Sequence, residues 1–551
     1  MPGRARALGA ERLAIGVVLL AVAALVVVPI ARLAKASTDA SVGRVLRSPG
    51  ISTAAWHTVL VAVVVTAVAV PLGAAMALLL RRPELPARRT LRVAVVLPLV
   101  VPQFVLGYSW TEAYARAGFT DSVLGIHWDG LIGPVGVIVV LAVNAVPVGY
   151  LLATAGLVTR AQPELERAAR ASGATAWTAL RTVTLPVLRP ALAAAGVLTF
   201  VATLESFAVP QVLGTPAGFS TLTTRIYADL SLGSDPASFT DAVTLALGLV
   251  LIAALVLVPA DVVLAPRLRA ERSGQPAGPA QRQRRTWRSY AAAATLGGYV
   301  LLVALLPLLA LVAASITRAV GLPPTSGNWT LANFRAVLNG TTTGALRHSL
   351  ELAVAAATLL VVLGALSAVL ERRRSGRLLA TAATLTFVIP GSTLAVAVLI
   401  AYGRWFDGTL TLILVAYLAK LWALAHRPIS GALDRFPTAE WQAARASGAA
   451  PPTAVRTIWL PALAPALLGA WVLTFVTALH EVTMSSLLYS TRSQTLAVVV
   501  LNSQELGDVG PTAALSVLLT ALLLAAVLPA WAVAHACNRW RAPRQEVAGA
   551  L

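Results

Sequence analysis

The chain has 551 residues, of which 58% are hydrophobic and 12% are charged, and its formal net charge is +20. Because soluble domains carry about 25% charged residues, this composition excludes a soluble protein and indicates a polytopic membrane protein. The arginines occupy short loops between apolar runs rather than one polar domain, which argues against a nucleic-acid-binding protein.

Twelve apolar segments have about the length of 20 residues, or more, that an α-helix needs to span a bilayer. We expect an all-α fold with spans near 13–31, 56–80, 91–113, 131–158, 190–213, 241–265, 289–314, 347–370, 378–402, 409–426, 465–488 and 512–536. A cleaved signal peptide is the alternative for the first segment. Its apolar part has about 18 residues against the usual 7–15, which favours a retained helix.

Arginine-rich segments alternate along the chain with loops that carry acids. The arginines gather in 81–92, 160–189, 267–288, 372–377, 427–456 and 539–544. The acids of the intervening loops are Asp121, Asp129, Asp229, Asp235, Asp407, Glu505 and Asp508. Since positive charge marks the cytoplasmic side of a membrane protein, both termini are predicted to be cytoplasmic, with the lipid bilayer around the spans.

A hydrophilic segment at 165–192 occurs again at 440–467, at a constant offset of 275 residues. Residues 168–174 are identical to residues 443–449. Each copy belongs to a set of six spans, and an even number gives both sets the same orientation, so we predict two parallel six-helix repeats. The repeats are expected at 1–266 and 289–551, joined by a Gly-, Pro- and Gln-rich cytoplasmic linker at 267–288.

Each copy of the repeated segment predicts a helix, a glycine turn and a second helix on the cytoplasmic face. In the first copy the helix over 165–171 ends at Gly173, and Thr175 caps a helix that runs to about residue 184. In the second copy the prolines 451–452 occupy the matching first turn. The prolines that follow are expected to bend the chain into the next span. An ordinary amphipathic connector is the alternative, but two near-identical copies on one face favour a docking surface for a two-fold partner.

This segment resembles the EAA loop of ABC-importer permeases, with the first loop at 163–190 and the second at 438–465. The residues assigned to it are Ala168, Ala169, Arg170, Gly173, Leu185 and Pro186, and Ala443, Ala444, Arg445, Gly448, Leu460 and Pro461. The motif glutamate is absent from its register, where Arg167 and Gln442 stand. The resemblance implies that each loop is a coupling helix seated in a cleft of one of two cytoplasmic ATPase subunits. It also implies an extracytoplasmic solute-binding protein and a location in the bacterial cytoplasmic membrane.

Within that family the fused two-half form is most similar to ferric-iron permeases. The similar segments are 97–102, 205–214 and 487–490. Ferric iron is therefore the expected solute, while thiamine, polyamine and phosphonate importers share the architecture and are alternatives. An ion-coupled secondary transporter is the alternative from another class, and the duplicated loop disfavours it.

The chain contains no motif for ATP hydrolysis of its own. A phosphate-binding loop needs Gly-Lys-Ser/Thr, whereas the two lysines, Lys35 and Lys420, follow Ala34 and Ala419. We therefore expect a transport subunit that is not an enzyme and holds no cofactor, with ATP and Mg²⁺ bound by the partner ATPase. The single cysteine and the absence of zinc-type spacing predict no metal site.

Four ionisable residues fall in or at the ends of predicted spans. They are Glu112, Glu205, His480 and Glu481. An acid at the centre of a spanning helix costs about 2.5–3.5 kcal/mol on insertion scales, so such groups usually face a cavity or a partner. We expect these residues to line the translocation path, where carboxylates suit a cationic solute. A position near the outer water interface, or pairing with nearby polar groups, is the alternative.

Overall fold

The computed structural model describes residues 13, 15–38, 49–81, 84–160, 163–233, 235–270, 286–319, 321–323, 325–372, 379, 382–383, 386, 389–434, 436 and 438–548. These residues form helices and no strand, which confirms the all-α class. Among them 10 helices are long and apolar enough to cross a membrane, or up to 11 if one bent pair counts as a single span. The expected total of twelve is not reached within the described residues.

Two predicted spans account for the difference. The segment at 91–113 is not straight, because Arg88–Val100 and Gln103–Leu124 meet at a bend of 102°. Pro102 caps the second piece and has no N–H to continue the helix, which explains the break. The segment at 378–402 forms α20 (Gly391–Phe406), and most residues of its first half lie outside the described part of the chain.

The chain divides into two compact units. Unit 1 contains Met1–Ala40, Val337–Gly507 and Leu518–Leu551, and unit 2 contains Ser41–Ala336 and Asp508–Val517. Each unit therefore holds most of the described spans of one sequence half together with the first span of the other half. The predicted linker falls mostly on 271–285, outside the described residues.

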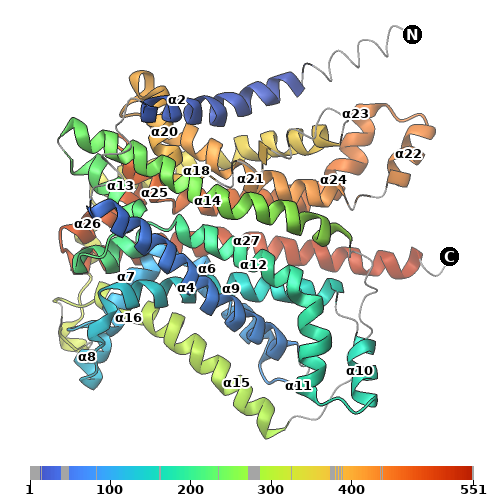
Figure 1. Cartoon of the computed structure of the whole chain (residues 1–551), viewed down its shortest axis with the longest axis horizontal. Helices are drawn as coiled ribbons and strands as arrows, with labels where there is room; N and C mark the ends of the chain where they lie inside the picture. Colours follow the sequence, from blue (N-terminus) through green and yellow to red (C-terminus); the bar gives the residue numbers. More distant parts are fainter. Residues whose placement is uncertain are drawn as a thin grey trace. The chain divides into compact units, whose positions relative to one another are not determined.

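Unit 2 is built around three long helices that pack on one another, α4, α9 and α12 (Figure 1). Its helices are α4 (Pro49–Leu80), α5 (Arg88–Ala94), α6 (Leu97–Val100), α7 (Gln103–Tyr114), α8 (Phe119–Leu124), α9 (Pro134–Arg160), α10 (Pro163–Ala171), α11 (Ala176–Ala179), η3 (Leu180–Thr184), α12 (Leu185–Leu204), η4 (Pro210–Gly214), α13 (Leu222–Ser231), α14 (Pro236–Ala270), α15 (Trp287–Val300), η6 (Leu301–Leu305) and α16 (Leu306–Ser315). The span formed by α15, η6 and α16 belongs to the second sequence half, yet its α16 packs on α7.

Unit 1 repeats this arrangement with α18, α21 and α24 as the central helices. Its helices are η1 (Ala23–Val27), α2 (Val28–Thr38), α18 (Gly340–Glu371), α20 (Gly391–Phe406), α21 (Leu410–Leu433), α22 (Thr438–Ala446), α23 (Pro451–Ala454), η8 (Val455–Trp459), α24 (Leu460–Leu479), α25 (Thr483–Leu488), α26 (Leu496–Glu505) and most of α27 (Val509–Ala548). Here α2, from the first sequence half, packs on α20.

A glycine allows the two longest central helices to cross closely in each unit. A Cβ atom added to Gly73 in α4 would lie 2.5 Å from the backbone of Val146 and Tyr150 in α9. A Cβ atom added to Gly364 in α18 would lie 3.1 Å from the backbone of Ala425 in α21. Small residues at such crossings are the usual way for membrane helices to gain packing contacts.

Candidate functional site

The two repeated loops have the same structure, element by element. Helix α10 and helix α22 begin and end at residues that differ by 275, and so do α11 and α23, η3 and η8, and α12 and α24. Within unit 2, α10 and α11 lie at the end opposite α8, and within unit 1, α22 lies at the end opposite α26 (Figure 1). Each loop is thus a terminal projection of its unit.

A glycine turn closes the first helix of each loop, as the sequence predicts. Gly173 has φ +88° and Gly448 has φ +84°, a left-handed conformation that favours glycine. The amide of Ala174 donates to the carbonyl of Ala169 at 3.0 Å, and Ala449 donates to Ala444 at the same distance. These bonds satisfy carbonyls at the helix end, so the turn is fixed by the backbone rather than by contacts with other elements.

The turn presents the motif residues to the exterior. In the first loop Ala168, Arg170 and Gly173 are exposed and Ala169 is half-buried, and the corresponding residues of the second loop have the same exposure. Those residues are Ala443, Ala444, Arg445 and Gly448. A Cβ atom on either glycine would meet nothing within 4 Å. Ala179 and Ala454 are fully buried and anchor the following helix. Most motif residues around the two turns are therefore exposed.

The helix that follows the turn continues without a break into a candidate membrane span, which corrects the expected spans at 190–213 and 465–488. These spans are Ala176–Leu204 and Val455–Leu479. The π-helical turns η3 and η8 lie directly before Leu185–Pro186 and Leu460–Pro461. A proline ring displaces the carbonyl one turn earlier, and a π turn absorbs that displacement without ending the helix. Motion of the turn would thus be transmitted along one continuous helix.

The two loops are held to their units by different interactions. In the first, Glu166 of α10 lies 3.7 Å from Arg81, which follows the end of α4. In the second, the ring of Trp459 packs against Trp441 of α22 in a tilted contact at 5.5 Å and edge-on against Phe436 at 6.0 Å between ring centroids. Glu166, adjacent to the register of the missing motif glutamate, is thus engaged within the chain.

Two of the predicted path residues occupy equivalent positions at helix ends. Glu205 directly follows α12 and His480 directly follows α24, again 275 residues apart. The expectation that Glu205 lies inside a span is therefore wrong, because the helix ends at Leu204. Both side chains are half-buried. Glu112 lies within α7, on a different helix of the unit that contains Glu205.

Glu481 caps a short helix and does not lie within α24, where the sequence places it. Its carboxylate accepts hydrogen bonds from the amide of Met484 at 2.9 Å and from the amide of Ser485 at 3.1 Å. The hydroxyl of Tyr417, from α21, forms a 2.6 Å hydrogen bond with that of Ser485. A carboxylate at a helix N-terminus is favourable because it faces the unpaired amides and the positive end of the helix dipole. Glu481 thus has a structural function at the start of α25.

A chain of neutral polar groups occupies the corresponding place in unit 2. Ser206 donates to Gln103 at 3.0 Å, Gln103 donates to Asn144 at 3.0 Å, and Asn144 donates to the carbonyl of Pro98 at 2.8 Å. Pro98 and Gln103 flank the 102° bend. The chain therefore satisfies buried polar groups and holds the broken helix against α9.

Lys420 also lies in a span, and the sequence motifs assign it no function. It lies ten residues after the start of α21, as Asn144 lies ten residues after the start of α9. Its Nζ atom donates to the carbonyl of Ile389 at 2.8 Å, and its side chain is half-buried. A charge at the centre of a membrane helix is costly, about 2.5–3.5 kcal/mol on insertion scales. The chain has two lysines, and the position of this one near the centre of a span is the sequence signal that marks it as a candidate functional residue.

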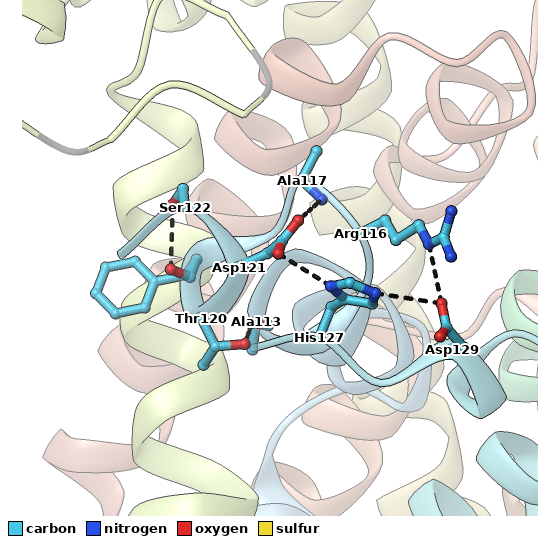
Figure 2. Close-up of polar contacts among 9 residues, drawn as sticks. Ala113, Arg116, Ala117, Thr120, Asp121, Ser122, His127 and Asp129 are labelled. Carbon is cyan, nitrogen blue, oxygen red and sulfur yellow. Dashed lines mark hydrogen bonds and ion pairs between the residues drawn. The ribbon is translucent and has the colours of Figure 1, made fainter. Parts of the chain in front are cut away.

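A charged cluster closes the loop between α7 and α9, at the end of unit 2 opposite α10 (Figures 1 and 2). His127 lies between two carboxylates, with Nδ1 3.0 Å from Asp121 and Nε2 3.4 Å from Asp129. Arg116 pairs with Asp129 at 2.9 Å, and Asp121 also accepts from the amide of Ala117 at 2.8 Å. Figure 2 shows the two carboxylates on either side of the imidazole ring, with the Arg116 guanidinium against Asp129. The cluster fixes the loop, and the arginine offsets one of the carboxylates.

No group of three or more His, Cys, Asp or Glu side chains that could hold a metal ion occurs within the described ranges. A solute that is itself a metal ion would be cargo, and its passage needs no resident site.

A family model and several known proteins match the sequence of this chain. The family model described as "Binding-protein-dependent transport system inner membrane component" matches residues 69–269 and 360–541. The probable ABC transporter permease protein y4fN of Sinorhizobium fredii is 27% identical over 534 residues, which are 91% of this chain and 90% of that protein.

Two further relatives are named for different solutes. The ferric transport system permease protein FbpB of Actinobacillus pleuropneumoniae is 24% identical over 452 residues, 79% of this chain and 64% of that protein. The molybdenum transport system permease protein ModB of Mycobacterium tuberculosis is 34% identical over 214 residues, 38% of this chain and 79% of that protein.

Proposed function

Because the chain belongs to the family of binding-protein-dependent transport system inner membrane components, we propose that it is the permease subunit of an ATP-driven importer, with both permease halves in one polypeptide. The observation that carries this proposal is the pair of projecting loops, α10–α11 and α22–α23, whose elements repeat at a constant offset. Two equal projections suit two copies of one ATPase subunit. The chain itself is not an enzyme in this proposal, and ATP with Mg²⁺ belongs to the partner.

The mechanism follows from the continuity of the helices. ATPase subunits that close on ATP would move the turns at Gly173 and Gly448, and the rigid helices that start there would carry the motion into the membrane. The residues Glu112, Glu205, His480 and Glu481 are proposed to line the path that this motion opens. An extracytoplasmic binding protein would deliver the solute, with the chain in the bacterial cytoplasmic membrane and both termini and both loops on the cytoplasmic side.

Co-purification tests the docking surface directly. Gly173→Arg and Gly448→Arg would place a long side chain on the exposed turns, and we expect each to reduce recovery of the ATPase subunit at least tenfold. Gly125→Arg and Gly507→Arg are matched controls, since both glycines also have positive φ and open space, but follow α8 and α26 at the other ends of the units. Undiminished binding by both loop variants, or no ATPase recovered with the wild type, would overturn the proposal.

Ferric iron is the first solute to test, since FbpB aligns over 79% of this chain. An inorganic oxyanion is the second candidate, favoured by the cationic side chain of Lys420 at the centre of α21. Thiamine, polyamines and phosphonates are further alternatives. Uptake of labelled iron into iron-starved cells, with and without this chain, separates the first candidate from the others. Unchanged iron uptake in cells without another iron importer would remove it.

A further inference from the structure

We propose that Lys420 and the first turn of α20 form a binding site for an oxyanion inside unit 1, so that the solute passes this unit as an anion. The inference rests on the proposed importer function and specifies its substrate class. The supporting observations are the place of the lysine, the helix end beside it, and the contrast with the same place in unit 2.

The position of Lys420 prevents its charge from reaching water by extension of the side chain along the bilayer normal. It lies ten residues from Leu410 and thirteen from Leu433, the ends of α21. At 1.5 Å per residue these distances are about 15 and 20 Å, longer than a lysine side chain. An ionisable group at this depth is most often part of a solute or ion pathway.

The ammonium group adjoins a helix N-terminus. Ile389, whose carbonyl accepts from Lys420, stands two residues before Gly391, the first residue of α20. That helix of 16 residues has no acid in its first turn and no side chain that caps its amides. The positive end of the helix and the ammonium charge therefore occur together. An anion interacts favourably with both.

A second polar group in this turn points to a ligand independently. Ser392, the second residue of α20, is 1% exposed, and its Oγ atom has no hydrogen-bond partner. Buried hydroxyl groups are nearly always paired, so a buried hydroxyl without a partner in the first turn of a helix marks a place where a ligand oxygen would complete the bonding. Hydroxyl groups and helix amides both donate to oxyanions.

The residues at the equivalent place in unit 2 differ in charge and in side-chain length. There, the neutral Asn144 stands in place of Lys420, and the side chain of Gln103 opens α7 where Gly391 opens α20. Gln103 joins Ser206 to Asn144 and closes the chain of hydrogen bonds. Gly391 has no side chain to do so, and a Cβ atom there would meet only Met484, at 3.6 Å. Unit 1 thus has a cation where unit 2 has an internal amide, and it lacks the glutamine side chain that closes the chain of hydrogen bonds in unit 2.

The nearby carboxylate of Glu481 is directed to another helix. It accepts from the amides of Met484 and Ser485 at the start of α25. The N-termini of α25 and α20 in unit 1 therefore differ in the charge beside them. The carboxylate of Glu481 lies at the N-terminus of α25, whereas the ammonium group of Lys420 lies beside the N-terminus of α20.

Two solutes share the oxyanion chemistry. One is a free tetrahedral oxyanion such as molybdate, and the other is ferric iron enclosed in an oxyanionic complex such as ferric citrate. A bare ferric cation is excluded by this proposal, because the site is positive.

Uptake measured with both probes distinguishes these sources. In the intact transporter, Lys420→Asn copies the neutral residue of unit 2 and Lys420→Arg keeps the charge. Lys35→Asn removes the other lysine of the chain. We expect Lys420→Asn to lower uptake of one probe at least tenfold, with Lys420→Arg and Lys35→Asn close to wild type. The probe that is affected identifies the source. Wild-type uptake by Lys420→Asn would overturn the inference.

A second measurement applies if neither probe is taken up. With ¹⁵N-labelled lysine the full chain gives signals from two side chains, and Lys420→Arg identifies one of them. Molybdate or ferric citrate should shift or broaden the Lys420 signal and leave that of Lys35 unchanged. A Lys420 signal insensitive to both probes overturns the inference. Failure of the proposed function is separate, since it is seen as loss of ATPase co-purification in the wild type.

Discussion

The hydroxyl of Tyr402 donates a 2.5 Å hydrogen bond to the carbonyl of Ala24, a residue 378 positions earlier in the chain. Ala24 is the second residue of the π turn η1. The same contact occurs in unit 2, where Tyr114 donates to Leu302, the second residue of the π turn η6, also at 2.5 Å. A π turn leaves carbonyls without their usual helical donors, and the two tyrosines supply donors to them.

Removal of either hydroxyl is expected to loosen the first span of the opposite half. Tyr402→Phe and Tyr114→Phe should each lower the free energy of unfolding by about 0.6–1.7 kcal/mol, the range for polar contacts between membrane helices. Thermal unfolding of the purified chain in detergent measures this. Tyr290→Phe, at an exposed tyrosine of α15, is the control and should change nothing. Equal midpoints for all three variants would contradict the prediction.

Within this chain, the glycine turns of the loops should tolerate small residues according to backbone conformation. Because a Cβ atom at Gly173 or Gly448 meets nothing within 4 Å, the penalty of substitution is the cost of positive φ, about 1–2 kcal/mol for most residues and less for Asn. We expect transport to fall in the order Gly, Asn, Ala, Val at each position. The ATP-dependent uptake rate and the stimulated ATPase rate are the measurements, and a Val variant as active as the Asn variant would contradict the prediction.

The close helix crossings should respond unequally to one added methyl group. Gly73→Ala places a carbon 2.5 Å from backbone atoms of α9, which cannot move independently of their helix, whereas Gly364→Ala meets α21 at 3.1 Å. We expect Gly73→Ala to destabilise unit 2 by about 1–3 kcal/mol and Gly364→Ala to cost less. Gly248→Ala, in α14 with no atom within 4 Å, is the control. The order of thermal midpoints checks the argument.

Glu481 allows the structural and transport functions to be separated. Glu481→Ala removes the acceptor for two amides and should lower stability by about 0.5–2 kcal/mol, as loss of a helix cap does. Glu481→Gln keeps an acceptor oxygen and should retain most of that stability. If the charge also acts on the solute, Glu481→Gln will lower the uptake rate at nearly unchanged stability. Wild-type uptake by Glu481→Gln would leave the residue a helix cap alone.

The loops were predictable because their structure is local. The helix, the left-handed glycine and the capped second helix each follow from residues within a few positions of one another, such as Thr175, whose hydroxyl accepts from the amide of Thr178. Their repetition at a constant offset made the two-fold character of the chain visible. The apolar segments also gave the fold class, since length and composition determine which helices can span a membrane.

The neighbours of each span were not predictable in this way. The segments at 13–31 and 289–314 are apolar on all sides, and nothing in their composition indicates which helices they pack against. The helix ends at Glu205 and His480 were also missed, because apolar residues continue on both sides of the break. Lys420 was visible in the sequence, but its helix end was not, since Ile389 is brought to it by the fold.

The exchange of first spans has a consequence for the order in which the protein is made. When the ribosome has completed residue 270, unit 2 still lacks the span formed by residues 287–315. The first span, residues 15–37, lacks the helices of unit 1 that it packs against until the segment from Gly340 onward is synthesised. Fusion of the two halves in one polypeptide keeps each first span tethered to the helices it packs against, whereas two separate gene products would have to meet by diffusion.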